Sequence, residues 1–308
     1  MNKILVTGVD GFVGRHVVKE LISHGHEVVG LGGENKNKRL DGLSSYQKLD
    51  LTKIEEASKI DFKEIEAVIH LAGMAAVGPS FENPMLYIDT NSRIESNLFE
   101  ISKRQGMKPK FLIISSGSLY DPSASLPLTE ASSVLPNSPY AVSKLTQEQL
   151  GAYYTSIGFQ VVTARPFNHI GPGQNPGFIV PDIAEQIVAI EKNIIDELHV
   201  GNLTAQRDYT DVRDIARAYR LLIEKGISGE IYNICSGSAV SGSEIVSSLL
   251  KNSTKKITPL VDPSKLRPVD NPIIYGSYEK LHKQTGWRPE IKLDQTLIDV
   301  MSDWRSRE

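Results

Sequence analysis

Short apolar runs alternate with amphipathic stretches through the first half of the chain, a pattern that predicts strands alternating with helices. The expected strands are 3–6, 27–31, 45–48, 67–71, 110–115 and 160–165. The expected helices between them are 12–23, 53–60, 84–104 and 139–156. Repeated alternation of this kind predicts an α/β fold, a doubly wound parallel sheet of the Rossmann type with helices on both faces.

Beyond residue 165 the pattern loosens. The stretch 165–177 is rich in glycine and proline, so we expect a loop, and a long loop in a compact domain is usually functional. Helical patterns follow at 178–192, 212–225, 241–250 and 293–304, with a strand-like run at 230–235. The expected units are a domain of residues 1–165, with returning segments near 206–235, and a smaller C-terminal α/β lobe of 166–205 and 236–308. A ligand is expected in the crevice between them.

A glycine-rich turn joins the first predicted strand to the first predicted helix. Gly8 allows the tight turn, Gly11 lets the backbone approach phosphates, and Gly14 lets the helix pack on the strand. The spacing is G-x-x-G-x-x-G and not the common G-x-G-x-x-G, so the strand before and the helix after carry the prediction. We expect this turn to place a dinucleotide pyrophosphate over the helix N-terminus.

Composition excludes several classes of function. The 308 residues are 40% hydrophobic and 23% charged, and the net charge of −3 gives no reason to expect nucleic acid or a membrane as partner. No apolar run reaches the about 18 residues of a membrane span. The single cysteine, Cys235, and the lack of a signal-peptide pattern predict a cytoplasmic protein. His24 and His26 have no further ligand nearby, so no metal site is expected.

A second informative stretch carries Tyr140 and Lys144. Ser138 is a good N-cap and Pro139 a good first helical residue, so the tyrosine and the lysine share one face of a helix's first turns. The ammonium group and the helix N-terminus both favour phenolate, which predicts a pKa of Tyr140 below its usual value of about 10. Such a tyrosine can exchange a proton with a carbonyl or an alcohol near neutral pH.

Together these motifs resemble the extended short-chain dehydrogenases/reductases, in the branch that modifies nucleotide sugars. The likeness runs almost end to end, through Gly8, Gly11, Gly14, Asp50, 70–73, Asn91, 115–116, Tyr140, Lys144, 165–174, 207–209, 267–268 and 286–287. It implies that Ser116 bonds the substrate carbonyl, Tyr140 donates the proton and Lys144 holds the nicotinamide ribose. It also implies coenzyme contacts at Gly8, Gly11, Phe12, Val13, Gly14, Asp50, Leu51, Leu71, Ala72, Gly73, Asn91, Tyr140 and Lys144.

Departures from the family patterns narrow the reaction. The 4,6-dehydratases carry acidic residues just after the hydroxyl residue, where this chain has Gly117 and Ser118. The 3,5-epimerase–reductases carry a cysteine at the position of Ser118, and the only cysteine here lies in a predicted strand. Dehydration and 3,5-epimerisation are therefore disfavoured. Reduction of a keto group at C4, or reversible 4-epimerisation, remains.

The stretches 165–174, 177–181, 186–187 and 266–268 are most similar to the branch of GDP-4-keto-6-deoxy-D-mannose reductases, which make GDP-D-rhamnose with a reduced nicotinamide. Several members of that branch carry a glutamate at the position of Ser118. The resemblance thus implies a C4 reductase that acts on a GDP-sugar. The alternatives are a UDP-hexose-type 4-epimerase with tightly held NAD and, more remotely, a non-catalytic dinucleotide sensor.

The resemblance also implies which residues bind the substrate and that the protein forms a homodimer. Asn168, Arg207 and Arg267 are implied to bind the diphosphate of the nucleotide sugar, and Asp270 the ribose of its nucleotide. His169, in the same loop as Asn168, either orients substrate or packs the loop. A homodimer through the predicted helices 84–104 and 139–156 is implied.

The choice of coenzyme depends on the end of the second strand. NAD-binding members carry an acid there that bonds the adenine ribose, but residues 28–33 contain none and Glu34 comes late. The basic run 35–39 is suited to a 2′-phosphate, or is simply a solvated loop. We therefore favour NADP, with NAD as the alternative. Asp50 resembles the residue that contacts the adenine amine.

Overall fold

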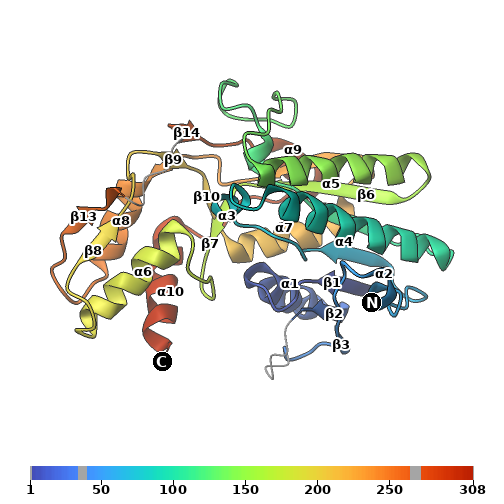
Figure 1. Cartoon of the computed structure of the whole chain (residues 1–308), viewed down its shortest axis with the longest axis horizontal. Helices are drawn as coiled ribbons and strands as arrows, with labels where there is room; N and C mark the ends of the chain where they lie inside the picture. Colours follow the sequence, from blue (N-terminus) through green and yellow to red (C-terminus); the bar gives the residue numbers. More distant parts are fainter. Residues whose placement is uncertain (1, 34–39, 264–271, 308) are drawn as a thin grey trace.

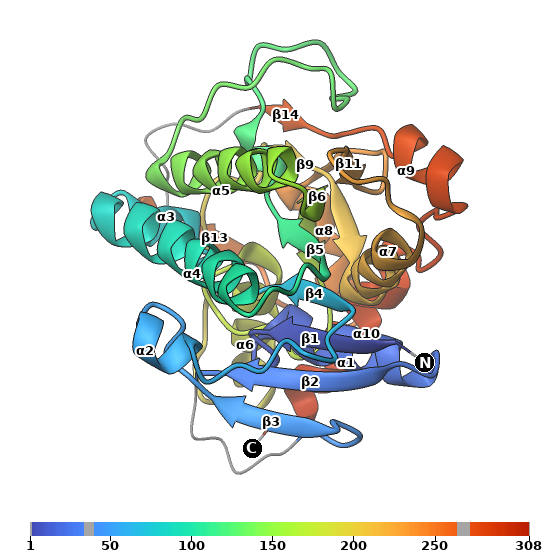
Figure 2. The ribbon, with the colours of Figure 1, turned by 90° about the vertical axis from the view of Figure 1, so that its right-hand side faces the viewer.

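The structure, a computed structural model, describes residues 2–33, 40–263 and 272–307. Its centre is a seven-stranded parallel sheet in the order β11-β6-β5-β4-β1-β2-β3 (Figure 2). The strands are β1 (Lys3–Thr7), β2 (Glu27–Gly32), β3 (Ser45–Lys48), β4 (Ala67–His70), β5 (Lys110–Ile114), β6 (Gln160–Pro166) and β11 (Ile231–Ile234). Strands β2 and β3 lie on one side of β1, and β4 and the later strands lie on the other side. The direction in which strands are added therefore reverses between β1 and β4. Ligands bind at such a switch point, outside the carboxyl ends of the strands.

Helices cover both faces of this sheet (Figure 2). One face carries α1 (Phe12–Ser23), α7 (Val212–Lys225) and α9 (Glu279–Thr285). The other face carries α2 (Ile54–Ala57), α3 (Val77–Ser80), α4 (Pro84–Arg104) and α5 (Pro139–Ser156). Successive residues of a strand point to opposite faces, and Ile4 and Val6 accordingly pack with α1 and α7, while Leu5 packs with α4. The predicted doubly wound fold is confirmed.

A smaller lobe lies beside the carboxyl edge of the sheet, at the left of Figure 1. Its helices are α6 (Ile179–Glu191), α8 (Gly242–Lys251) and α10 (Leu293–Ser306), which share one apolar core. Its strands pair in three small sheets: β7 (Asn168–Ile170) with β10 (Tyr209–Asp211), β8 (Leu198–Val200) with β13 (Pro259–Val261), and β9 (Gln206–Arg207) with β12 (Val240–Ser241) and β14 (Ile273–Ile274). Leu281 and Trp287 pack in the core of the large sheet, although they lie within the stretch 236–308 that we expected in the smaller lobe.

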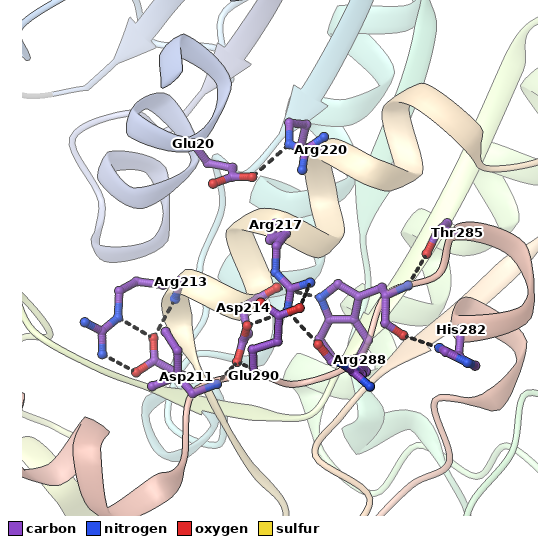
Figure 3. Close-up of polar contacts among 12 residues, drawn as sticks. Glu20, Asp211, Arg213, Asp214, Arg217, Arg220, His282, Thr285, Arg288 and Glu290 are labelled. Carbon is purple, nitrogen blue, oxygen red and sulfur yellow. Dashed lines mark hydrogen bonds and ion pairs between the residues drawn. The ribbon is translucent and has the colours of Figure 1, made fainter. Parts of the chain in front are cut away.

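Helix α7 connects the two units through polar contacts (Figure 3). Arg213 Nη2 donates to Asp211 Oδ2 at 2.7 Å. The same nitrogen also donates to Asp299 Oδ2 of α10 at 2.7 Å. The buried Asp214 accepts from the backbone N–H groups of residues 290 and 291, both at 2.9 Å. Its carbonyl oxygen accepts from Trp287 Nε1 at 2.9 Å. One helix thus fixes α10 and the segment before it against the sheet.

None of the helices in the described part of the chain has the length and apolar character to cross a membrane.

Candidate functional site

The glycine turn has the close approaches that its sequence predicts. Gly8 has a φ of +71°, and a Cβ there would lie 2.9 Å from the Ala72 nitrogen. A Cβ at Gly14 would overlap the Gly8 carbonyl oxygen, so only glycine lets α1 approach β1 this closely. Gly11 is the N-cap of α1 and makes no side-chain cap, which leaves the first N–H groups of α1, from Phe12 and Val13 onward, for an anion.

The segment after β4 is fixed beside this turn by two side chains. The Thr7 hydroxyl, at the end of β1, accepts from the Leu71 and Ala72 N–H groups at 3.1 and 3.0 Å. Asn91 Oδ1 accepts from Met74 N at 2.8 Å, and a Cβ at Gly73 would crowd that oxygen. The ends of β1 and β4 are thereby held next to each other. The structure brings the predicted coenzyme residues 8–14, 71–73 and 91 together at the switch point.

Asp50 and Leu51 lie after β3, on the far side of β2. Asp50 Oδ1 accepts from the Thr52 hydroxyl at 2.6 Å and from the Thr52 N–H at 3.1 Å. These bonds, the side-chain one first, lower the pKa of Asp50 below its usual value. The carboxylate thus already has partners within its own turn, and Leu51 is buried behind it.

An acidic group that the sequence reasoning missed lies at the end of β2. Asp10, from the glycine turn, occupies the space that a side chain at Gly32 would fill, since a Cβ there would overlap Asp10 Oδ2. The Tyr46 hydroxyl donates to the same oxygen at 2.9 Å. The only sign of this contact in the sequence is that β2 ends in a glycine, which leaves room for the side chain of Asp10. Residues 34–39, including Glu34 and the basic run, lie outside the described part.

The three predicted catalytic residues meet at the carboxyl end of β5. Ser138 caps α5 through a 3.2 Å bond from Ala141 N, which places the buried Tyr140 in the first turn. Ser116 follows β5 and caps the short helix η1 (Gly117–Leu119); its hydroxyl accepts from Ser118 N and Ser118 Oγ at 3.1 and 2.9 Å. Lys144 Nζ lies 5.9 Å from the centre of the Tyr140 ring.

The pKa values in this group differ from the sequence expectation. Burial raises the pKa of Tyr140 above 10, and a hydrogen bond with the Ser116 side chain only partly opposes this. Burial also lowers the pKa of Lys144 to about 8. Lys144 Nζ donates to the Ile114 carbonyl oxygen at 2.8 Å and to Gln147 Oε1 at 2.9 Å. The expectation of a lowered Tyr140 pKa is therefore wrong, because burial raises this pKa by more than the Ser116 hydrogen bond lowers it.

The predicted substrate residues lie on two of the small sheets. Asn168 is on β7, beside His169, whose ring stacks on that of Phe12 with centroids 6.2 Å apart. Arg207 is on β9, and its Nη1 donates to the Gln206 carbonyl oxygen at 2.8 Å. His169 therefore bridges the loop and the glycine turn. Arg267 and Asp270 lie outside the described residues.

The stretch 165–177, which we expected to be a loop, contains the end of β6 and the whole of β7, and only the part after β7 is irregular. That part is held from both units by groups that the sequence reasoning did not single out. His16 Nε2, from α1, lies 2.9 Å from the Pro172 carbonyl oxygen. Asp303 Oδ2, from α10, accepts from the Gly173 N–H at 2.9 Å. Arg307 Nη2 donates to the Gln174 carbonyl oxygen at 3.1 Å. These contacts join positions far apart in the sequence, so no local motif announces them.

Residues 5–300 of the chain match the family described as GDP-mannose 4,6 dehydratase. The chain is 34% identical to the GDP-6-deoxy-D-mannose reductase of Pseudomonas aeruginosa, over 99% of this chain and 98% of that protein. It is 29% identical to UDP-glucose 4-epimerase 2 of Oryza sativa, over 100% and 82% of the two chains.

Two solved structures show the same architecture. That of RMD from Pseudomonas aeruginosa complexed with NADPH matches with a TM-score of 0.90 and 33% identity, and each chain is covered completely. That of the UDP-glucose 4-epimerase from Thermotoga maritima with UDP-glucose also has a TM-score of 0.90, with 28% identity over 98% of each chain. The likeness thus extends over both the large sheet and the smaller lobe.

Proposed function

Because the chain belongs to the family described as GDP-mannose 4,6 dehydratase, we propose that it is a nucleotide-sugar oxidoreductase of that family. Its proposed reaction is reduction of the C4 keto group of a nucleotide-linked 4-keto-6-deoxyhexose, with GDP-4-keto-6-deoxy-D-mannose as substrate and GDP-D-rhamnose as product. The observation that carries this proposal is the meeting of Ser116, Tyr140 and Lys144 at the end of β5. The 34% identity to a GDP-6-deoxy-D-mannose reductase supports the sugar.

Dehydration is disfavoured in spite of the family's description. A Cβ at Gly117 would lie 2.9 Å from the Phe167 ring, so there is no room for an acidic side chain there without displacing that ring. The Ser118 hydroxyl donates to Ser116 and is not an acid. Elimination of water needs a proton donor and acceptor beside the hydroxyl residue. The residues after Ser116 do not supply such a pair.

The geometry supports the following roles for the protein's residues in the proposed reduction. The coenzyme, when bound, supplies the hydride. The glycine turn and the N-terminus of α1 hold its pyrophosphate, and Lys144 holds its nicotinamide ribose. Ser116 positions the substrate oxygen, and Tyr140 gives its proton to that oxygen as it becomes an alkoxide. The raised pKa of Tyr140 suits this direction, because a proton donor must enter the reaction protonated.

NADPH is the favoured coenzyme and NADH the alternative. NADPH is supported by the absence of an acid in residues 28–33 and by the similarity to RMD, whose structure contains NADPH. NADH is supported by the Asp10 carboxylate, which lies where the missing acid would be. Asp50 and Leu51 are proposed to contact the adenine.

The substrate diphosphate is assigned to Asn168, Arg207 and Arg267, and the ribose of its nucleotide to Asp270. Asn168 supports this assignment because it is exposed on β7, next to the loop that reaches the glycine turn. Arg207 is partly buried on β9 of the smaller lobe. A guanidinium group is suited to bidentate binding of phosphate.

A 4-epimerase is the second candidate, favoured by the 28–29% identity to UDP-glucose 4-epimerases. An epimerase returns the hydride to its own substrate, so it retains oxidised coenzyme and consumes none. The amount of NAD that accompanies the purified protein, and the net loss of reduced nicotinamide on turnover, therefore separate the two candidates.

A homodimer through α4 and α5 is also proposed. Apolar side chains are exposed on these helices: Met85 is 69% exposed, Leu86 53% and Tyr153 53%. The resemblance to the extended short-chain dehydrogenases/reductases carries this proposal, and exposed apolar side chains on both helices are compatible with it. We also assign the protein to the cytoplasm, since its one cysteine, Cys235, is a free and buried thiol.

The deciding experiment follows NADPH absorbance with freshly prepared GDP-4-keto-6-deoxy-D-mannose, for wild type and Tyr140→Phe. The reductase predicts fast oxidation by the wild type and a loss of at least about a hundredfold in the variant, the usual contribution of a positioned proton donor. Tyr154→Phe is the matched control, because Tyr154 is another buried tyrosine of α5, near the other end of that helix, and its hydroxyl contacts Glu100. No oxidation by the wild type with either NADPH or NADH would refute the substrate assignment.

A further inference from the structure

A carboxyl group lies buried in the interface between α4 and α5. Glu95 of α4 is 1% exposed, and neither of its carboxyl oxygens makes a full hydrogen bond with any residue in the described ranges. Buried carboxyl groups are rare unless they are paired, because burial penalises their charge. Nothing in the proposed reaction uses this group, so its position requires a separate explanation.

The packing of the two helices shows what Glu95 faces. Asn91 Nδ2 donates to Ser143 Oγ at 2.9 Å, and the Tyr154 hydroxyl donates to Glu100 Oε1 at 2.9 Å. Residue numbers rise together in these two contacts, so α4 and α5 run in the same direction. One turn beyond the contact of Asn91 with Ser143, Glu95 of α4 comes opposite Gln147 of α5.

Gln147 links this position to the proposed catalytic lysine. Its Oε1 accepts from Lys144 Nζ at 2.9 Å, and its Nε2 lies 3.5 Å from His70 Nε2, which leaves the second N–H group of the amide for a further partner. Gln147 is itself 2% exposed, so these partners belong to the protein core. Glu95 and Lys144 therefore lie on either side of one buried amide.

We propose that Glu95 is a positioning residue for Lys144: through Gln147, its carboxylate holds the lysine side chain in place and keeps that side chain charged. The inference rests on the proposed role of Lys144 and assigns a function to a residue outside the Ser116–Tyr140–Lys144 set.

The electrostatics agree with this geometry. Burial raises the pKa of Glu95 well above its usual value, and the charge of Lys144 and then the Gln147 amide oppose that rise. Burial lowers the pKa of Lys144 to about 8, and Glu95 opposes that fall. Each group thus favours the charged form of the other. Removing the carboxylate must lower the pKa of Lys144 further.

The other charged and titratable groups around the pair do not replace Glu95. His70 of β4 is fully buried, which lowers its pKa to about 3 and leaves it neutral at physiological pH. Glu148 of α5 is engaged by Arg165, with Arg165 Nη2 2.7 Å from Glu148 Oε2. Tyr140 is kept neutral by its raised pKa. Among the described groups, Glu95 alone raises the pKa of Lys144.

The test measures the titration of Lys144 by NMR in coenzyme-free protein labelled with ¹³C at the lysine Cε. The resonance is assigned by its loss in Lys144→Met. In Glu95→Gln, which preserves side-chain size, the midpoint is expected to fall by about one pH unit. Glu100→Gln, on the same helix but facing Tyr154, is the matched control and leaves the midpoint unchanged. Glu95→Asp restores the charge and much of the shift.

An unchanged Lys144 midpoint in a folded Glu95→Gln protein would overturn the inference, because a purely structural role for Glu95 changes stability and not this titration. If that variant does not fold, wild-type protein labelled at the glutamate Cδ decides. One carboxyl resonance must then shift at the pH where Lys144 titrates, and the absence of such a step refutes the coupling. Neither measurement requires turnover. A negative result would therefore refute the role of Glu95 without bearing on the proposed reaction.

Discussion

The Asp10 carboxylate and the Gly32 α-carbon face each other at the end of β2, so closely that a Cβ at Gly32 would overlap Asp10 Oδ2. In dinucleotide-binding folds this is the place of the acid that bonds the adenine ribose. A residue of the glycine turn thus brings a negative charge to a strand end that has none of its own.

Replacing Asp10 by asparagine is expected to favour NADPH. A carboxylate repels the dianionic 2′-phosphate, so its removal is expected to raise kcat/KM for NADPH relative to NADH by about tenfold, equivalent to about 1.4 kcal/mol. Initial rates with both coenzymes measure the ratio. Tyr46→Phe removes the hydrogen bond to Asp10 but keeps the charge, and it serves as the control. The same ratio in Asp10→Asn and wild type would show that Asp10 does not select the coenzyme.

Gly14→Ala is expected to destabilise the protein and to weaken coenzyme binding together. The added methyl would overlap the Gly8 carbonyl oxygen and would lie 2.7 Å from the Val9 α-carbon, so α1 has to move away from β1. Overpacking of this kind costs about 1–3 kcal/mol. Chemical denaturation and fluorescence titration with NADPH measure the two effects. Gly33→Ala, where a Cβ meets nothing within 4 Å, is the neutral control. A fully stable Gly14→Ala protein would contradict the proposed close packing.

The Glu148–Arg165 pair is expected to be strongly coupled. Arg165 Nε and Nη2 donate to the two carboxyl oxygens, both at 2.7 Å, and both side chains are 5% exposed. Glu148→Leu leaves the guanidinium buried without its partner, at a cost of about 3–5 kcal/mol. The double variant with Arg165→Met should recover much of that loss. Urea unfolding of the four proteins tests the cycle, and additive single losses would refute the coupling.

Acidification is expected to destabilise the fold through His70. Burial, followed by the charge of Lys144, lowers its folded-state pKa to about 3, whereas the unfolded value is about 6.5. The unfolded chain therefore binds the proton first. Stability is full above pH 6.5 and falls by up to about 1.4 kcal/mol per pH unit until the folded form is protonated near pH 3. Unfolding free energies at several pH values measure the slope. In His70→Gln the slope should lose the contribution of one proton; an unchanged slope would exclude His70 as its source.

Local pattern was sufficient for the strands of the large sheet, for the longer helices and for the glycine turn, but it did not predict the short strands of the smaller sheets. The alternation of Ile4, Leu5 and Val6 between two cores, and the serine cap that starts α5 two residues before Tyr140, are both encoded by neighbouring residues. The predicted ends of strands and helices accordingly lie close to the observed ones.

Contacts between distant positions and the effect of burial were not predictable in the same way. The contact of Asp10 with Gly32 depends on how β1 and β2 lie side by side, and that of Asp303 with Gly173 depends on where α10 packs. The sign of the Tyr140 pKa shift depends on how much water the fold excludes, and a four-residue spacing carries no information on that.

The Thr7 hydroxyl has a consequence for recombination between relatives. It ties the end of β1 to the segment after β4, where the half of the sheet expected to hold adenosine meets the half expected to hold nicotinamide. A segment exchanged between relatives to alter coenzyme preference should therefore begin after Thr7 and end before the residues that follow β4. A chimera that takes Thr7 and the residues after β4 from the same parent is expected to keep the two halves of the sheet aligned. A chimera that takes them from different parents is expected to lose this alignment.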